Sequence, residues 1–314
     1  MRIIFIGTPD FAVPSLQILH ENGYDVVSVV TVPDKPAGRG RKLQASAVKQ
    51  YADSVGIPVL QPHKLRDLDF LGKLQDLQPD LMVVVAFRML PKLVWDIPEI
   101  GTFNLHGSLL PDYRGAAPIN WVLINGEKET GLTTFMIDSK IDTGNLMLQE
   151  KVTIPFEWTA GDLHDHMMEV GAKLVLKTVQ GLEAGELTAY PQDDSLFKNK
   201  APKIFREDCQ IDWNQPVEVV YNFVRGLSPY PAAWTEVDEK VLKIFRASII
   251  SEKVETPGVV RHVEETSRLM IACTDGWLEI EQLQLAGKKR MSTADFLRGQ
   301  KDSLEGKQLE SPVT

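Results

Sequence analysis

Three polar side chains whose combination can catalyse attack on a carbonyl lie in turn-rich parts of the chain: Asn104, His106 and Asp142. Asn104 and His106 are two positions apart, so an extended strand projects both side chains from one face. An amide can donate to an oxyanion, an imidazole can move a proton, and a carboxylate can orient or charge the imidazole. We interpret the three residues as a catalytic set, although by this pattern alone a core histidine is the alternative for His106.

The sequence offers no side chain in the usual setting of a nucleophile. It has no Gly-x-Ser-x-Gly turn, and its two cysteines, Cys209 and Cys273, have neither disulfide nor zinc spacing. The turn at 7–11 lacks the Gly-x-Gly-x-x-Gly pattern and a Walker lysine, which argues against a dinucleotide or nucleoside triphosphate site. The Asp-Thr-Gly triplet at 142–144 occurs once, whereas an aspartic protease needs two carboxylates. We infer that the nucleophile arrives with a substrate and that the reaction is a transfer.

Length and composition indicate a globular protein of about two domains, since the chain has 314 residues with 43% hydrophobic content. The longest apolar run, 81–87, is too short for a membrane span and is typical of a buried strand. The first ten residues contain too few apolar positions for a signal-peptide core. We therefore expect a cytoplasmic protein.

The charge of the chain is unevenly distributed. The net charge of −9 argues against sequence-blind binding of nucleic acid. From Lys240 onward there are 12 Lys and Arg against 11 Asp and Glu, a balance of +1, so residues 1–239 carry −10. Four cations nevertheless gather in the glycine-bearing segment 34–43, and Gly-Lys-Lys-Arg at 287–290 forms another basic cluster. We predict that the segment 34–43 contacts a polyanion.

Strands and helices alternate in the front part of the chain. Such alternation predicts parallel strands whose carboxyl ends meet at one edge of a sheet. Apolar or β-branched runs predict strands at 2–6, 25–32, 59–60, 81–86, 102–105, 132–137 and 149–154. Helical spacing of apolar residues predicts helices at 11–23, 45–55, 66–77 and 161–180. This order is typical of an α/β fold with a doubly wound, mostly parallel sheet covered by helices on both faces.

The rear part has a different character. Segment 188–216 lacks periodicity and carries three prolines, so we interpret it as a linker. A short helix is predicted at 217–225. Short strands follow at 233–237, 243–251, 258–263, 269–273 and 276–285. Their regular spacing predicts a small barrel or sandwich.

The stretch N-L-H-G-S-L-L-P-D-Y-R-G-A-A-P at 104–118, together with I-D-T-G at 141–144, resembles the folate-dependent formyltransferases. The segments 7–16, 33–43, 226–234 and 287–291 narrow the resemblance to the branch that formylates methionine on charged initiator tRNA. The resemblance implies a Rossmann-like catalytic domain at 1–188, a linker at 189–207 and a tRNA-binding barrel related to the oligonucleotide-binding fold at 208–314. It also implies 10-formyltetrahydrofolate as co-substrate, no metal, initiator Met-tRNA as partner and no membrane; we expect a monomer.

The resemblance also assigns roles to individual residues. Asn104, His106 and Asp142 are carried over as the catalytic set. The implied tRNA-binding residues are Arg39, Arg41, Lys42, Lys288, Lys289 and Arg290. The implied folate-binding residues, largely through their backbone, are Phe87, Arg88, Met89, Leu90, Ser108, Leu109, Leu110, Pro111, Ile137 and Asp138. Arg88 departs from the family pattern, which commonly has a small residue at this position. The backbone near the pterin can therefore follow a different path here, whereas the class of reaction is unaffected.

The same residues leave two other functions open. One is formyl transfer to a sugar-nucleotide amine or to glycinamide ribonucleotide. Glycinamide enzymes are similar only through the first domain, and sugar enzymes lack the G-R-G-R-K loop in this form. The other is a non-catalytic nucleotide- or RNA-binding module, against which the complete Asn–His–Asp set argues.

Overall fold

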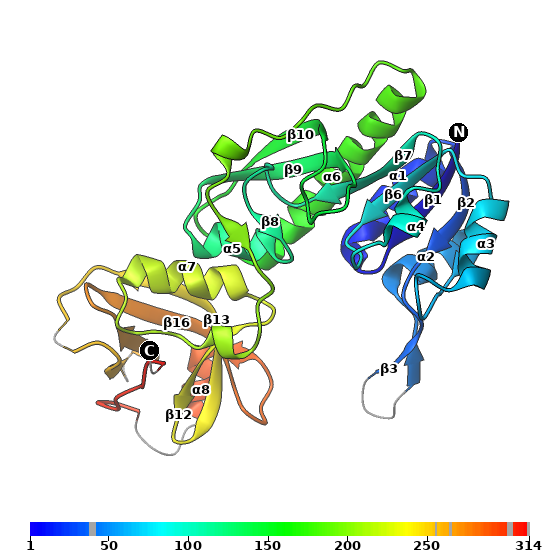
Figure 1. Ribbon diagram of the computed structural model, residues 1–314. Coiled ribbons are helices and arrows are strands. Elements are labelled where there is room, and N and C mark those ends of the chain that lie inside the picture. The colour runs from blue at the N-terminus through cyan, green and yellow to red at the C-terminus, as the bar shows by residue number, and fades with distance from the viewer. Residues whose placement is uncertain (38–41, 255, 264–265, 300–303, 313–314) are drawn as a thin grey trace. The chain divides into compact units, whose positions relative to one another are not determined.

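The computed structural model describes residues 1–37, 42–254, 256–263, 266–299 and 304–312. Its chain forms two compact units (Figure 1). The first comprises Met1–Gly115, Glu129–Thr153 and His164–Lys200. The second comprises Ala116–Lys128, Ile154–Leu163 and Ala201–Thr314.

The first unit is built on a seven-stranded sheet of order β10-β9-β7-β6-β1-β2-β5. Its strands are β1 (Arg2–Gly7), β2 (Asp25–Val30), β5 (Val59–Leu60), β6 (Leu81–Val85), β7 (Gly101–His106), β9 (Glu129–Met136) and β10 (Leu146–Thr153). The first five pair in parallel, whereas β9 and β10 are antiparallel additions. The chain winds outward from β1 in both directions, so the winding reverses between β1 and β6. The doubly wound, mostly parallel sheet is thus confirmed, and its carboxyl edge is where a ligand is expected.

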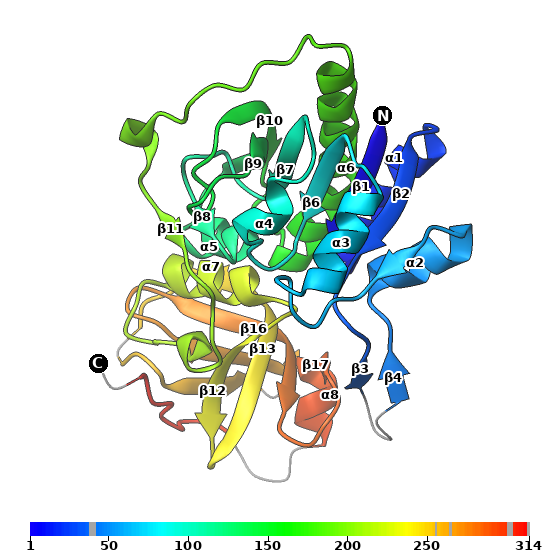
Figure 2. The ribbon, with the colours of Figure 1, turned by 45° about the vertical axis from the view of Figure 1, so that its right-hand side comes forward.

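Helices cover both faces of this sheet because the central strands are apolar on both sides. The helices are α1 (Val13–Glu21), α2 (Ala47–Val55), α3 (Leu68–Asp76), α4 (Lys92–Trp95) and α6 (Ala160–Glu183). Alternate residues of β1 and β6, such as Ile4 and Met82, pack in one apolar cluster with α3 and α4. On the other face, Gly171 of α6 lies against Leu105. Figure 2 shows α3 and α4 in front of the sheet and α6 behind it.

The second unit contains an antiparallel sheet of order β12-β13-β16-β15-β14, with β17 paired to β16. Its strands are β12 (Ala233–Val237), β13 (Lys240–Ile250), β14 (Val260–Val263), β15 (Arg268–Ala272), β16 (Trp277–Leu285) and β17 (Met291–Ser292). Its helices are α5 (Pro118–Ile124), α7 (Val217–Leu227) and α8 (Thr293–Arg298). Val220 and Val224 of α7 pack with the fully buried Trp213 in the core of this unit. Every strand expected in the rear part is present, and the related oligonucleotide-binding barrel stays a prediction.

Several short elements had no periodic signal in the sequence. They are β3 (Lys35–Ala37), β4 (Lys42–Gln44), β8 (Arg114–Gly115), β11 (Lys200–Ala201), and the 3-10 helices η2 (Asp194–Leu196) and η3 (Glu207–Cys209). The 3-10 helix η1 (Asp10–Ala12) leads into α1 and overlaps the helix expected at 11–23. β3 and β4 form an antiparallel hairpin that projects from the first unit (Figure 2). Within the described ranges, no helix has the length and apolar character needed to cross a membrane.

Candidate active site

Strand β7 places Asn104 and His106 at the carboxyl edge of the first unit's sheet. Asn104 pairs with Val84 on one side and Phe135 on the other, and His106 pairs with Thr133. Their i, i+2 spacing puts both side chains on one face, as the sequence predicted. His106 is 6% exposed. The Asn104 amide makes no hydrogen bond to any residue that the structure describes, so it is available to a ligand.

The imidazole of His106 is held by a backbone carbonyl. Its Nε2 lies 2.9 Å from the carbonyl oxygen of Tyr113. Since that oxygen can only accept, Nε2 carries the hydrogen and donates it. The other nitrogen, Nδ1, faces Asp142 Oδ2 at 3.9 Å. This distance exceeds a hydrogen bond but suits attraction between a carboxylate and a protonated ring, so Nδ1 is the nitrogen left for proton transfer.

Asp142 is fixed by the turn that carries it. Its Oδ2 accepts a hydrogen bond from the Gly115 N–H at 2.9 Å. Asp138 closes the same turn by accepting from the Lys140 N–H and the Thr143 hydroxyl, both at 2.9 Å. At Gly144 any Cβ would stand 1.7 Å from the Met136 carbonyl oxygen, so only glycine fits. The Asp-Thr-Gly triplet is therefore a packed turn, and the Gly115 N–H holds its carboxylate.

Three non-glycine residues with positive φ surround these side chains. They are Ala86 (49°), directly after β6, Tyr113 (57°), whose carbonyl holds His106, and Asp142 itself (54°). Such residues are uncommon and persist only where the surrounding structure fixes them. Their gathering at one edge of the sheet makes this edge the candidate site.

A further side chain that sequence reasoning missed reaches the Asp142 turn. Gln192 Nε2 donates to the carbonyl oxygens of Asp142 (2.9 Å) and Gly144 (2.8 Å). Its Oε1 accepts from Arg114 Nε (3.1 Å) and Nη2 (2.6 Å). Gln192 lies in the segment that we interpreted as a linker, and no periodicity or motif pointed to it.

The residues expected to bind folate differ in their exposure. Ser108, Leu110 and Pro111 are buried, and the Ser108 hydroxyl donates to the Asp112 carbonyl at 2.6 Å. The backbone of Ser108 and Leu110 is also engaged, since the Ser108 carbonyl and the Leu110 N–H bond to the Thr133 hydroxyl and the Leu110 carbonyl accepts from Gln149. Arg88 and Met89 are exposed at the end of β6. Leu109, Ile137, Asp138 and Phe87 are partly exposed, whereas Leu90 is buried.

A cavity of about 510 Å³ begins at this exposed segment. Its lining residues are His63, Lys64, Leu65, Arg66, Arg88, Met89, Leu90 and Pro91. Three are cationic and none is acidic, so the lining is suited to an anion with an apolar body. The Arg88 guanidinium donates to the Pro62 carbonyl at 3.0 Å, which turns this unusual side chain towards the loop before α3.

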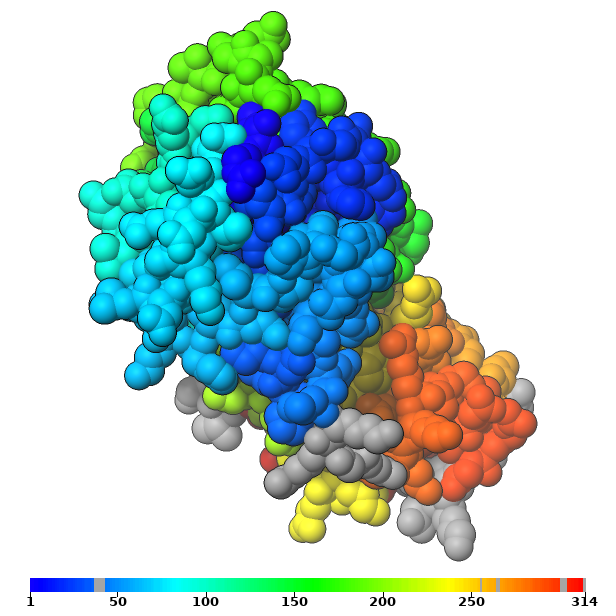
Figure 3. All heavy atoms as spheres, turned by 90° about the vertical axis from the view of Figure 1, so that its right-hand side faces the viewer, coloured from blue at the N-terminus to red at the C-terminus, as the bar shows by residue number. Residues whose placement is uncertain are grey.

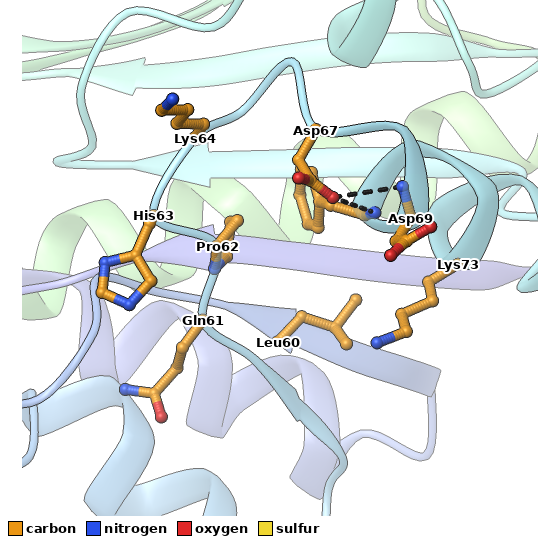
Figure 4. Close-up of a pocket in the computed structure, with 9 residues that line it drawn as sticks. Leu60, Gln61, Pro62, His63, Lys64, Asp67, Asp69 and Lys73 are labelled. Atoms are coloured by element: carbon orange, nitrogen blue, oxygen red, sulfur yellow. Dashed lines mark hydrogen bonds between the residues drawn. The ribbon is translucent and has the colours of Figure 1, made fainter.

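A second cavity of about 520 Å³ shares His63 and Lys64 and continues along the same loop (Figure 4). Figure 4 shows Asp67 turned to the backbone N–H groups of Asp69 and Phe70, at 3.1 and 3.2 Å, where it caps α3. This carboxylate is therefore engaged in helix capping. Figure 3 turns this part of the first unit, in light blue and cyan, towards the viewer.

The structure describes only some of the cations that are expected to bind tRNA. Arg39 and Arg41 lie outside the described residues, as does the side chain of Lys42. Lys288, Lys289 and Arg290 are exposed in the turn between β16 and β17. Arg290 lies 4.3 Å above the Phe245 ring and donates to Gln282 Oε1 at 2.6 Å. Partial burial, and then the positive charge of Arg246, lower the pKa of Arg290.

Neither thiol offers a nucleophile. Burial raises the pKa of Cys209 to about 11 and that of Cys273 to about 12, so both are protonated near neutral pH. Among the residues that the structure describes, no three His, Cys, Asp or Glu side chains form a group that could hold a metal ion.

A doubly wound sheet carries an unengaged amide, an imidazole and a carboxylate at its carboxyl edge, and both thiols are buried and protonated. These groups suit attack on a carbonyl by a nucleophile that a substrate supplies, as in a transferase. The model of the family described as formyl transferase matches residues 1–179, and that of its C-terminal domain matches residues 203–301. The chain therefore belongs to the formyl transferase family.

Individual proteins agree with this assignment. A methionyl-tRNA formyltransferase of Parabacteroides distasonis is 53% identical over 97% of both chains. The structure of HypX from Aquifex aeolicus in complex with tetrahydrofolic acid has a TM-score of 0.67 at 20% identity; it matches 95% of this chain, which spans 47% of that larger protein. A methionyl-tRNA formyltransferase from Clostridium thermocellum has a TM-score of 0.57 at 17% identity over 81% of this chain and 96% of that one. Both solved structures share the fold.

Proposed function

We propose that this chain transfers the formyl group of 10-formyltetrahydrofolate to the α-amino group of methionine on charged initiator tRNA. The placement of Asn104, His106 and Asp142 at one sheet edge supports the chemistry. The relative that is 53% identical over nearly the full length supports the choice of Met-tRNA as acceptor. The location that goes with this role is the cytoplasm.

The reaction begins with attack of the methionyl amine on the formyl carbon. A C–N bond forms, and the carbonyl electrons move to oxygen to give a tetrahedral alkoxide. The Asn104 amide, which has no protein partner among the described residues, donates a hydrogen bond to that oxygen. Such a donor is typically worth about 3 kcal/mol in the transition state.

His106 and Asp142 handle the proton that the amine loses. Nδ1 of His106 accepts it, because Nε2 already carries the hydrogen that it gives to Tyr113. The Asp142 carboxylate, 3.9 Å away, then stabilises the charged ring, and Nδ1–H can also donate to the alkoxide. When the alkoxide collapses, the bond to the folate nitrogen breaks and His106 returns the proton to that leaving group.

The folate lies, in this proposal, with its pterin against the backbone of 87–90, 108–111 and 137–138. Its p-aminobenzoyl-glutamate end extends into the cationic cavity. Lys64, Arg66 and Arg88 line that cavity and suit the glutamate carboxylates, while Met89 and Leu90 suit the apolar ring.

The tRNA is held by the two basic clusters, one of Arg39, Arg41 and Lys42 and one of Lys288, Lys289 and Arg290. The exposure of the second cluster supports this role, because phosphate contacts need accessible cations. We assign catalysis to residues 1–188, a connecting role to 189–207 and tRNA binding to 208–314, in a monomer.

The experiment is a formylation assay in which one folate donor is offered to different acceptors. Charged initiator tRNA, charged elongator tRNA, free methionine, a nucleotide-linked amino sugar and glycinamide ribonucleotide are compared. We expect efficient transfer to the charged initiator tRNA alone. Preferred formylation of the sugar or of glycinamide ribonucleotide would contradict the proposal, and absence of transfer to any acceptor would point to a binding module.

A further inference from the structure

Residues 190–199, here called the strap, contact both halves of the catalytic set although they lie far from it in sequence. At one end, the N–H and C=O groups of Tyr190 pair with Leu146 at 2.9 and 2.7 Å, just after the Asp142 turn. At the other end, the Tyr113 N–H donates to the Asn199 carbonyl at 2.9 Å, next to the carbonyl that holds His106. The strap therefore connects the histidine side of the site to the aspartate side.

Gln192 is the strap residue that touches the Asp142 turn by its side chain. Its amide nitrogen donates to the carbonyl oxygens of Asp142 and Gly144, at 2.9 and 2.8 Å. These two carbonyls lie on either side of Thr143, so the bonds fix the Asp142–Thr143 and Gly144–Asn145 peptide planes. The Gly115 N–H holds the Asp142 carboxylate itself at 2.9 Å. Backbone and side chain of Asp142 are thus fixed by different partners.

An amide is the side chain that this position requires. The two turn carbonyls need a donor, whereas the Arg114 guanidinium needs an acceptor and finds it in Gln192 Oε1. A glutamate would still accept from Arg114 but would set a carboxylate oxygen against two carbonyl oxygens. A methionine of similar length would neither donate to the two turn carbonyls nor accept from Arg114.

Arg114 is itself held in place. Its Nη2 contacts Asp194 Oδ1 at 2.7 Å, and its guanidinium lies 5.5 Å above the Phe197 ring. Both partners belong to the strap, so the acceptor end of Gln192 meets a guanidinium with a fixed orientation. The amide is thereby prevented from rotating its donors away from the turn.

We propose that Gln192 is a positioning residue for formyl transfer: its amide holds the Asp142–Gly144 turn so that the Asp142 carboxylate faces Nδ1 of His106. Asp142 adopts a positive φ of 54°, a conformation that needs support from its surroundings. Displacement of a catalytic group by about 1 Å can cost about a hundredfold in rate. This inference rests on the proposed function, in which Asp142 acts through His106.

The first test compares Gln192→Met and Gln192→Glu with the matched control Asp193→Ala. Asp193 is the next strap residue; it accepts from the Ser195 N–H at 3.0 Å and hydroxyl at 2.7 Å and does not touch the Asp142 turn. We expect both Gln192 variants to lower kcat by about tenfold or more while the KM values for folate and Met-tRNA change by less than about twofold. The control should lower Tm slightly and leave kcat unchanged. Equal losses of kcat in the control and in Gln192→Met would overturn the proposal, because the strap would then act only as a structural support.

The second test is a double-mutant cycle with Asp142→Asn. If Gln192 acts by placing the Asp142 charge, Gln192→Met should have almost no further effect once that charge is gone. If the double variant lost kcat by the product of the two single losses, the proposal would be overturned. Full turnover in Asp142→Asn alone would also overturn it, because the Asp142 charge would then have no role for Gln192 to support. Should Gln192→Met fail to fold, Gln192→Glu, which keeps the volume and the Arg114 contact, carries the same cycle. Formylation of Met-tRNA by the unsubstituted chain decides the proposed function separately.

Discussion

Replacing Asp142 with asparagine isolates the electrostatic part of the proposed mechanism. Asparagine keeps the size of the side chain and an acceptor for the Gly115 N–H, so the turn should keep its conformation. What is lost is a negative charge 3.9 Å from Nδ1 of His106. Two unit charges at this distance attract by about 1 kcal/mol in water and about 4 kcal/mol at an effective dielectric constant of about 20. Because the His106 and Asp142 side chains are only 6% and 16% exposed, we expect a loss of about 2–4 kcal/mol.

That loss corresponds to turnover slower by about 30-fold to about a thousandfold. The assay is single-turnover formylation of Met-tRNA at saturating folate, with folate affinity measured separately by fluorescence. Folate affinity should change by less than about twofold, since the charge acts on the transition state. Asp165→Asn is the matched control, because this exposed carboxylate lies 3.0 Å from the imidazole of His164, outside the site. Turnover of Asp142→Asn within about threefold of the unsubstituted enzyme, or an equal loss in the control, would refute the electrostatic role.

Four further predictions follow from the site and its surroundings. Asn104→Ala should lower turnover by about a hundredfold with an unchanged circular dichroism spectrum, because a transition-state donor is lost; near-normal turnover would remove it from the catalytic set. Arg88→Met should raise the KM for folate several-fold while leaving turnover at saturation nearly unchanged, and a selective fall in turnover would place Arg88 elsewhere. The triple alanine variant at 288–290 should bind Met-tRNA more weakly and with a shallower salt dependence; an unchanged slope, measured by filter binding, would mean that these cations do not meet phosphates. A disulfide reagent at pH 8 should leave Cys209 and Cys273 of the folded protein unmodified, since burial raises their pKa values to about 11 and about 12, and rapid modification would contradict this burial.

The sequence predicted those parts of the structure whose signal is local. Continuous apolar runs identified β1 and β6, and the spacing of Asn104 and His106 correctly placed both on one face of β7. Turn-forming residues around Asp142 indicated a second site segment, and the structure places its carboxylate 3.9 Å from His106. The predicted roles of these residues await the assays above.

The parts that escaped prediction depend on contacts between distant segments. Gln192 lies 50 residues from Asp142, and no pattern in either segment signals their hydrogen bond. The bond from His106 to the Tyr113 carbonyl depends on the positive φ of Tyr113, which tyrosine seldom adopts. Short elements such as α4 and the β3–β4 hairpin contain too few residues to establish a period.

The bond between His106 Nε2 and the Tyr113 carbonyl has a consequence for the kinetic order of the reaction. Because Nε2 is bonded to the Tyr113 carbonyl, Nδ1 must both take the proton from the incoming amine and return it to the departing folate nitrogen. Amine and folate must then meet the same side of the ring during one catalytic event. We therefore expect a ternary complex and intersecting double-reciprocal plots, with no exchange of label between formylated folate and free folate until the amine acceptor is present.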